Sequence, residues 1–143
     1  MTKSHGSFPS EVRHSLLDLH RSLLDAQRIR YERDHGRIET SGEFLGLVLE
    51  HPVFEWLREL SALIAQLDEW LEGGENARRE DFEEIAASLR SMIQAGGANT
   101  RFNKPYWELV EEAPAVLVEH VKLWRLLGPQ KSGNGGSARP SAP

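Results

Sequence analysis

The segment HPVFEWLRELSALIAQLDEWLEGG, residues 51–74, decides the fold class of this chain. Its apolar residues recur every three or four positions, which is the period of an amphipathic α-helix and not the alternation of a half-buried strand. On a helical wheel one stripe contains Val53, Leu57, Leu60, Ile64, Leu67 and Leu71. We therefore expect a helix over residues 52–72, opened by Pro52 and ended by Gly73 and Gly74.

Three further large side chains widen this apolar face: Trp56, Leu63 and Trp70 follow one another at intervals of seven residues. A helix with so broad an apolar face must be covered on two sides. Two interpretations stay open. The helix is the central element of a bundle, or the flank of Trp56, Leu63 and Trp70 is an interface for a protein partner, since exposed aromatic patches mark interaction sites.

The same period predicts helices in most of the remaining chain, over residues 11–35, 41–50, 77–94, a short segment from Asn103 to Glu112, and 114–127. Capping residues support these bounds, with Ser10 before the first helix and Thr40 with Glu43 as a capping box before the second. The short loops favour antiparallel neighbours. The sequence thus predicts an all-α protein, a compact up-and-down helical bundle of about four main helices plus one or two short bracing helices.

Length and composition bound the organisation of the chain. Its 143 residues suit a single domain, which we place at residues 10–127. Residues 1–9 are expected to form a flexible N-terminus, and the Gly-, Ser- and Pro-rich residues 128–143 a disordered tail. The absence of cysteine excludes thiol catalysis, disulfides and Cys-based metal sites. The apolar stretches are too short for a membrane span and no secretory signal is visible, so we expect a cytoplasmic protein of bacterial type without membrane association.

The charge pattern argues against nucleic-acid binding. The formal net charge is −5, and residues 41–75 carry eight acidic residues against the single basic residue Arg58. Four arginines gather in the second half of the first helix, but acidic residues lie between them; the arginines are Arg28, Arg30, Arg33 and Arg37. A nucleic-acid surface would need an uninterrupted basic patch. We expect these arginines to pair with the acidic third helix instead.

Polar side chains interrupt the apolar stripes of three predicted helices. They are His20, Gln27, Tyr31 and Asp34 in the first helix, Ser61 and Asp68 in the third, and His120 in the sixth. Burying a polar group costs free energy unless it is hydrogen-bonded, so we expect some of these side chains to meet in a buried polar cluster. This cluster either fixes the helix register or forms a ligand site. Asp68 should be partly buried and accept a hydrogen bond from His20, Arg30, Tyr31 or His120.

Signals for metal binding and catalysis are weak. Glu11-x-x-His14 and Glu32-x-x-His35 have the spacing of di-iron carboxylate proteins, but both lie on one helix, about 30 Å apart. A mononuclear site formed by His20, Asp68 and His120 is the arrangement that remains. Neither a phosphate-binding glycine motif nor a nucleophile elbow is present. We therefore assign no catalytic residue, no metal ligand and no cofactor.

Two segments, residues 19–32 and 51–68, resemble sequences of short, uncharacterised bacterial all-helical proteins, with Trp-Leu-Arg-x-Leu-Ser-x-Leu-Ile beginning at Trp56. This resemblance implies a compact helical fold and no known activity. The leading hypothesis is a small non-enzymatic helical-bundle protein that self-associates or binds a protein partner. The alternative is a ligand- or metal-binding bundle that uses the cluster of His20, Tyr31, Asp68 and His120.

Overall fold

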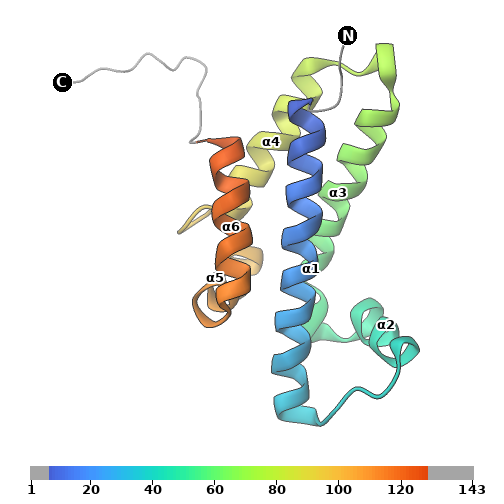
Figure 1. Ribbon diagram of the computed structural model, residues 1–143, viewed down its shortest axis with the longest axis vertical. Helices are drawn as coiled ribbons and strands as arrows, with labels where there is room; N and C mark the ends of the chain where they lie inside the picture. Colours follow the sequence, from blue (N-terminus) through green and yellow to red (C-terminus); the bar gives the residue numbers. More distant parts are fainter. Residues whose placement is uncertain (1–6, 129–143) are drawn as a thin grey trace, which may run out of the picture.

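A computed structural model describes residues 7–128 (Figure 1). These residues form six α-helices: α1 (Phe8–His35), α2 (Ser41–Glu50), α3 (Leu57–Glu72), α4 (Arg79–Ile93), α5 (Thr100–Glu112) and α6 (Pro114–Leu127). Two short 3₁₀ turns, η1 (Pro52–Phe54) and η2 (Gly74–Asn76), flank α3. Because residues 7–128 contain no strand, the predicted all-α class is confirmed. None of these helices is both long enough and apolar enough to cross a bilayer.

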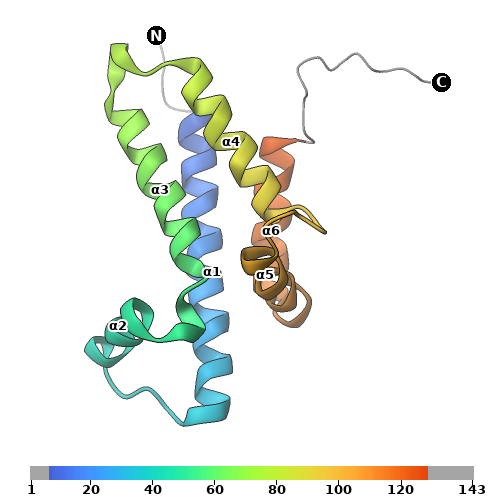
Figure 2. The ribbon, with the colours of Figure 1, turned by 180° about the vertical axis from the view of Figure 1, so that it is seen from behind.

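The longest helix, α1, is the central element of the fold. Its 28 residues pack against α3 and α6, which run antiparallel to it on either side (Figures 1 and 2). α4 crosses from the end of α3 toward α6, and α5 lies beside the start of α6 (Figure 2). α3 therefore has neighbours on two sides, α1 and α4, but the centre of the molecule belongs to α1.

The start of α1 differs from the prediction, because Ser7 and not Ser10 caps the helix. The Ser7 hydroxyl accepts a hydrogen bond from the Ser10 amide at 3.2 Å. Pro9 lies in the first turn, where a backbone N–H has no partner within the helix, so the N–H that proline lacks is not needed there. The Phe8 ring packs edge-on against Phe82, with centroids 5.9 Å apart. Residues 7–9 of the expected flexible N-terminus are thus ordered, whereas residues 1–6 and residues 129–143 of the expected tail lie outside the described residues.

The predicted third helix begins later than expected. His51 Nδ1 accepts a hydrogen bond from the Val53 amide at 3.1 Å, and residues 52–54 form the turn η1 before α3 begins at Leu57. The bounds predicted for α2 and α6 match those of the structure. At the start of α2, the Thr40 hydroxyl accepts from the Glu43 amide at 3.0 Å, while the Glu43 carboxylate accepts from the Glu39 amide at 3.1 Å.

α5 is longer than the short helix expected after Asn103. Asn99 caps it, and Asn103 is instead a buried residue within the helix. The Asn103 amide donates to the carbonyls of Met92 and Gln94 at 2.8 Å each, so it ties α5 to the end of α4. Gly97 makes this close turn achievable, since a Cβ there would lie 2.3 Å from the Ser91 carbonyl.

The core is one apolar cluster to which all helices except α2 contribute fully buried side chains. α1 contributes a stripe that includes Leu16, Leu19 and Leu23. The largest side chains with almost no exposure are Tyr106, Phe54 and Phe102, which come from α5 and η1. The core therefore extends over most of the bundle, and α2 only borders it, through the half-buried side chains of Phe44, Leu47 and Val48.

Candidate functional site

The polar side chains predicted to form one buried cluster are distributed over several separate environments. His20 and Asp34 both belong to α1, but 14 residues separate them, which is about 21 Å along a helix. The predicted members divide into a pair (His20 with Ser61), a group around one cavity (Gln27, Tyr31 and Asp34), and two residues with partners outside the prediction (Asp68 and His120). The prediction of a single cluster is therefore wrong, because side chains spread along one long helix lie beside different parts of the neighbouring helices.

His20 and Ser61 are the two predicted residues that contact each other directly. His20 Nε2 and Ser61 Oγ lie 2.9 Å apart, and Ser61 Oγ also donates to the Leu57 carbonyl at 3.3 Å. Partial burial lowers the pKa of His20 below its ordinary value, so the neutral ring is favoured. This contact joins α1 to α3 and follows from the register of the antiparallel pair.

Asp68 forms an ion pair with Arg13 and not with any of the expected donors. The register that places Ser61 beside His20 places Asp68, one heptad further along α3, beside Arg13, one heptad earlier on α1. The two side chains are 39% and 40% exposed. Asp68 is thus half-buried as predicted, but its partner is Arg13, an arginine exposed to the same extent.

The flank of Trp56, Leu63 and Trp70 is covered within the chain. Trp56 is 9% exposed, donates through Nε1 to Gln27 Oε1 at 3.2 Å and packs on the Phe102 ring. Leu63 is 6% exposed. Trp70 is half-buried against Phe82 of α4. The prediction of a partner interface at this flank is therefore wrong, because α1, α4 and α5 cover it.

His120 contacts a residue that the sequence analysis did not single out, Tyr106 of α5. The two are buried, and the Tyr106 hydroxyl and His120 Nδ1 form a hydrogen bond 2.6 Å long. Burial lowers the pKa of His120 and raises the pKa of Tyr106, so both stay neutral. Trp107 lies against one edge of the imidazole. A signal for Tyr106 was present, since it shares an apolar helical stripe with Phe102 and Leu109.

A metal site is not assembled from the predicted residues. Within residues 7–128, no group of three or more His, Asp or Glu side chains lies close enough to hold an ion. His20, Asp68 and His120 each have a different partner, which are Ser61, Arg13 and Tyr106. The mononuclear site considered from the sequence is therefore wrong in its geometry.

Three predicted residues do share one space, a cavity of about 280 Å³ lined by Gln27, Tyr31 and Asp34 together with Trp56 and η1. Tyr31 stacks on His35, with centroids 4.3 Å apart, and meets the edge of His51. The cavity therefore has an aromatic side and a charged rim between α1 and α5.

The arginines of α1 do not pair with α3 as expected. Arg30 lies 3.4 Å from Glu108 and 3.6 Å from Glu112, and Arg33 lies 3.0 Å from Glu112. Arg28 pairs within its own helix with Glu32 at 3.4 Å. The expected pairing of these arginines with α3 is wrong, because α5 lies beside the second half of α1. Arg30 and Arg33 therefore form their ion pairs with α5.

The most exposed apolar surface belongs to α2. None of its ten residues is buried. Phe44, Leu47 and Val48 are half-buried, and the Phe44 ring packs against Phe54 and beneath the Arg28 guanidinium.

The opposite side, which we call the outer face of α2, consists of Gly42, Leu45, Gly46 and Leu49. Leu45 and Leu49 are 57% and 60% exposed. Figures 1 and 2 show α2 standing away from the bundle at the end opposite the end of α6.

The two glycines of this outer face have no local explanation. Apart from the adjacent residues and the backbone of α2 itself, no atom of the described chain lies within 4 Å of the place where a Cβ at Gly42 or Gly46 would stand, and neither has a positive φ. A glycine inside a helix costs about 1 kcal/mol relative to alanine. The fold of one chain therefore gives no packing reason for either glycine, whereas the close approach of another helix would.

Sequence reasoning placed α2 within its observed bounds but gave it no role. The signal was the uninterrupted apolar run from Phe44 to Leu49 in so short a helix. Comparison of the chain with family models, curated proteins and solved structures finds no match in any of the three. The resemblance to short bacterial helical proteins stays a prediction.

Proposed function

We propose that this protein is a non-enzymatic helical bundle that acts by self-association through the outer face of α2. The observation that carries the proposal is that α2 has apolar side chains on both sides but no buried residue. One side packs on η1 and the other meets water. Leaving a contiguous apolar face in water is unfavourable, and such faces mark protein contacts.

A second copy of the chain is the partner that this face fits best. Gly42, Leu45, Gly46 and Leu49 include no charged residue, so the centre of a contact between two copies is free of like charges, and the exposed Glu43 and Glu50 lie at its edge. A two-fold axis brings the same surface of both copies together. In that arrangement Leu45 and Leu49 of one copy fill the open space above Gly42 and Gly46 of the other.

The size of the face makes this association weak. Full burial of one leucine contributes about 1.5–3 kcal/mol, and these leucines are already partly covered. Association itself costs on the order of 4–15 kcal/mol in lost freedom of motion. The dimer therefore belongs to the class of small, transient interfaces, and its population should rise with protein concentration.

Sedimentation velocity over a range of concentrations tests this proposal. The wild-type chain should show a concentration-dependent increase in mass, and the double variant Leu45→Glu, Leu49→Glu should remain monomeric. The double variant Leu117→Glu, Val118→Glu is the matched control, since these α6 side chains are 45% and 52% exposed. A wild-type protein that stays monomeric, or an equal effect of the control, would refute self-association through α2.

A second candidate is the binding of a small organic cation in the cavity beside Tyr31. It is favoured by the observation that Gln27, Tyr31 and Asp34 line one space with Trp56. Aromatic faces next to a carboxylate attract quaternary or primary ammonium groups. Tetramethylammonium should then change the tryptophan fluorescence saturably, and Asp34→Asn should weaken this response more than Asp25→Asn. An unsaturable response, or equal effects of the two variants, would exclude this candidate.

A further inference from the structure

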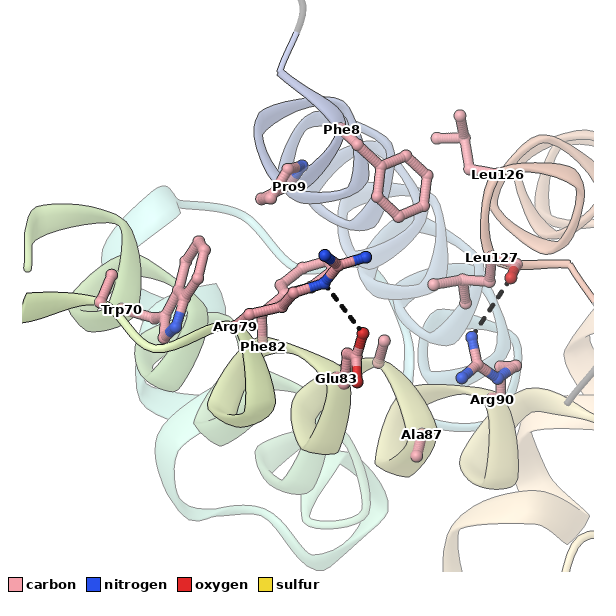
Figure 3. A pocket seen from close by; sticks show the side chains of 12 residues that line it. Phe8, Pro9, Trp70, Arg79, Phe82, Glu83, Ala87, Arg90, Leu126 and Leu127 are labelled. Atoms are coloured by element: carbon pink, nitrogen blue, oxygen red, sulfur yellow. Dashed lines mark hydrogen bonds and ion pairs between the residues drawn. The ribbon is translucent and has the colours of Figure 1, made fainter. Parts of the chain in front are cut away.

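A groove of about 970 Å³ lies at the end of the bundle opposite α2. It is bounded by the first turn of α1, by α4 and by the last turn of α6 (Figure 3). Its largest apolar lining residues are Phe8, Trp70, Phe82, Leu126 and Leu127. This volume is at the upper end of the range typical of small-molecule sites, about 300–1,000 Å³.

The aromatic wall of the groove is held in place by contacts within the chain. Phe82 lies between Phe8 and Trp70, with ring centroids 5.9 and 5.3 Å away. Trp70 is itself fixed, since its Nε1 donates to the Arg78 carbonyl at 2.7 Å. In Figure 3, Trp70 and Phe82 stand on one side of the groove and Leu126 and Leu127 on the other. The wall therefore needs little rearrangement to receive an apolar group.

Arg90 lies at the α6 end of this groove and lacks a counter-ion in the described chain. Its Nη1 donates to the Leu127 carbonyl at 3.2 Å, as the dashed line in Figure 3 marks. Its Nε is buried without a hydrogen-bond partner in residues 7–128. The guanidinium forms no ion pair within that range. Arg90 is half-buried, and the carboxyl end of α6 offsets only part of the cost of partly removing its charge from water.

A second arginine of the groove shows the contrast. Arg79 belongs to the same helix, but its side chain is 88% exposed and it pairs with Glu83 at 3.2 Å. Its charge is therefore met by water and by a carboxylate. Arg90 has an apolar groove on one side and a single carbonyl as its partner, which is the arrangement that an anionic group would complete.

We propose that this groove binds a fatty acid, with the carboxylate on Arg90 and the alkyl chain along Phe8, Phe82 and Leu126. A carboxylate supplies two oxygens in the plane of the guanidinium, so it can accept from the terminal nitrogens, while the enclosed Nε stays within the protein. The apolar wall removes the alkyl chain from water. The site is independent of α2, because it lies at the other end of the molecule.

Calorimetric titration of the full chain with decanoate and with 1-decanol, both below the concentrations at which they aggregate, tests this site. Decanoate should bind saturably to one site and at least about tenfold more tightly than decanol, since the alcohol cannot pair with the guanidinium. In Arg90→Gln this preference should disappear. Arg79→Gln is the matched control and should change decanoate affinity by less than about twofold, as expected for an exposed pair.

Three results would overturn the fatty-acid site. They are the absence of saturable decanoate binding, equal affinity of the wild-type chain for decanoate and decanol, and a carboxylate preference that persists in Arg90→Gln. Circular dichroism checks that Arg90→Gln is folded, since the substitution removes the hydrogen bond from Nη1 to the Leu127 carbonyl. If that variant does not fold, the comparison of the two ligands on the wild-type chain still decides the outcome.

Discussion

α2 and α3 both carry broad apolar faces, but only that of α3 is buried within the chain. α3 has 16 residues and lies against α1 and α4, so that its broad face, with Leu57, Leu60, Leu63 and Leu67, is buried. α2 has ten residues, packs mainly on η1 and buries none of them. An apolar pattern in the sequence thus indicates that a helix face will be unfavourable in water. Whether that face is buried within the same chain depends on which helices lie beside it.

The largest test of this difference replaces one large side chain in each region. Trp56→Ala should lower the free energy of unfolding by about 3–5 kcal/mol, because it leaves a cavity beside Phe102 and an unpaired Gln27 oxygen. Leu45→Ala, in the outer face of α2, should change it by no more than about 0.5 kcal/mol. Urea unfolding at low protein concentration, where association contributes least, measures both. Similar losses would mean that the two helices are equally covered.

Two glycine substitutions sharpen the comparison, because they should have opposite signs. Gly97→Ala puts a Cβ 2.3 Å from the Ser91 carbonyl and 3.0 Å from the Asn103 amide, and should cost about 1–3 kcal/mol. Gly46→Ala meets no atom within 4 Å and should stabilise the monomer by up to about 1 kcal/mol. Thermal unfolding records both changes. In sedimentation, Gly46→Ala should also weaken self-association, and an unchanged mass distribution would count against close helix packing there.

The sequence predicted those helix ends that depend on local chemistry. Thr40 and Glu43 define the start of α2, and Pro114 the start of α6. It failed where two equivalent caps compete. Ser7 replaces Ser10 because Phe8 packs on Phe82, and Asn99 replaces Asn103 because Asn103 reaches α4. Local signals cannot decide such cases, since the deciding contact is with a residue distant in sequence.

The candidate site was less predictable, because it depends on the register between helices. One offset of α3 along α1 determines that His20 meets Ser61 and that Asp68 meets Arg13. Helical periodicity gives the face of each side chain but not its height along a neighbouring helix. The sequence therefore identified His20, Asp68 and His120 correctly as residues that face a neighbouring helix. It did not identify which residue of that helix each one contacts.

Acid should destabilise the folded chain through two partly buried histidines, His20 and His120. Burial lowers the pKa of both His20 and His120 in the folded state, so the unfolded chain binds protons more readily. The free energy of unfolding should therefore be greatest above the ordinary histidine pKa of about 6.5 and fall as the pH drops below it. Urea unfolding between about pH 7.5 and 5.5 measures this slope.

His120→Gln is the control for this pH dependence. Its amide oxygen can still accept from the Tyr106 hydroxyl, but the side chain does not titrate. The slope should decrease and keep the part that comes from His20. A slope equal to that of the wild-type chain would mean that protonation of His120 does not oppose folding.

The smallest expected effect concerns the margin of α3, where Asp68→Ala is compared with Glu69→Ala. Had Asp68 been fully buried with its partner, its removal would cost about 3–5 kcal/mol. The ion pair with Arg13 is about 40% exposed on both sides, so we expect a loss of at most about 1 kcal/mol. Glu69 is exposed and forms no ion pair within residues 7–128, so its removal should change almost nothing.

Salt distinguishes this surface pair from a buried one. Screening at high ionic strength weakens exposed ion pairs, so the difference between Asp68→Ala and Glu69→Ala in a denaturant titration should shrink as salt is added. A difference of several kcal/mol that persists in salt would instead show that Asp68 is enclosed by α1. In that case the buried interface between α1 and α3 would include Asp68 and Arg13, although both side chains are about 40% exposed in the structure.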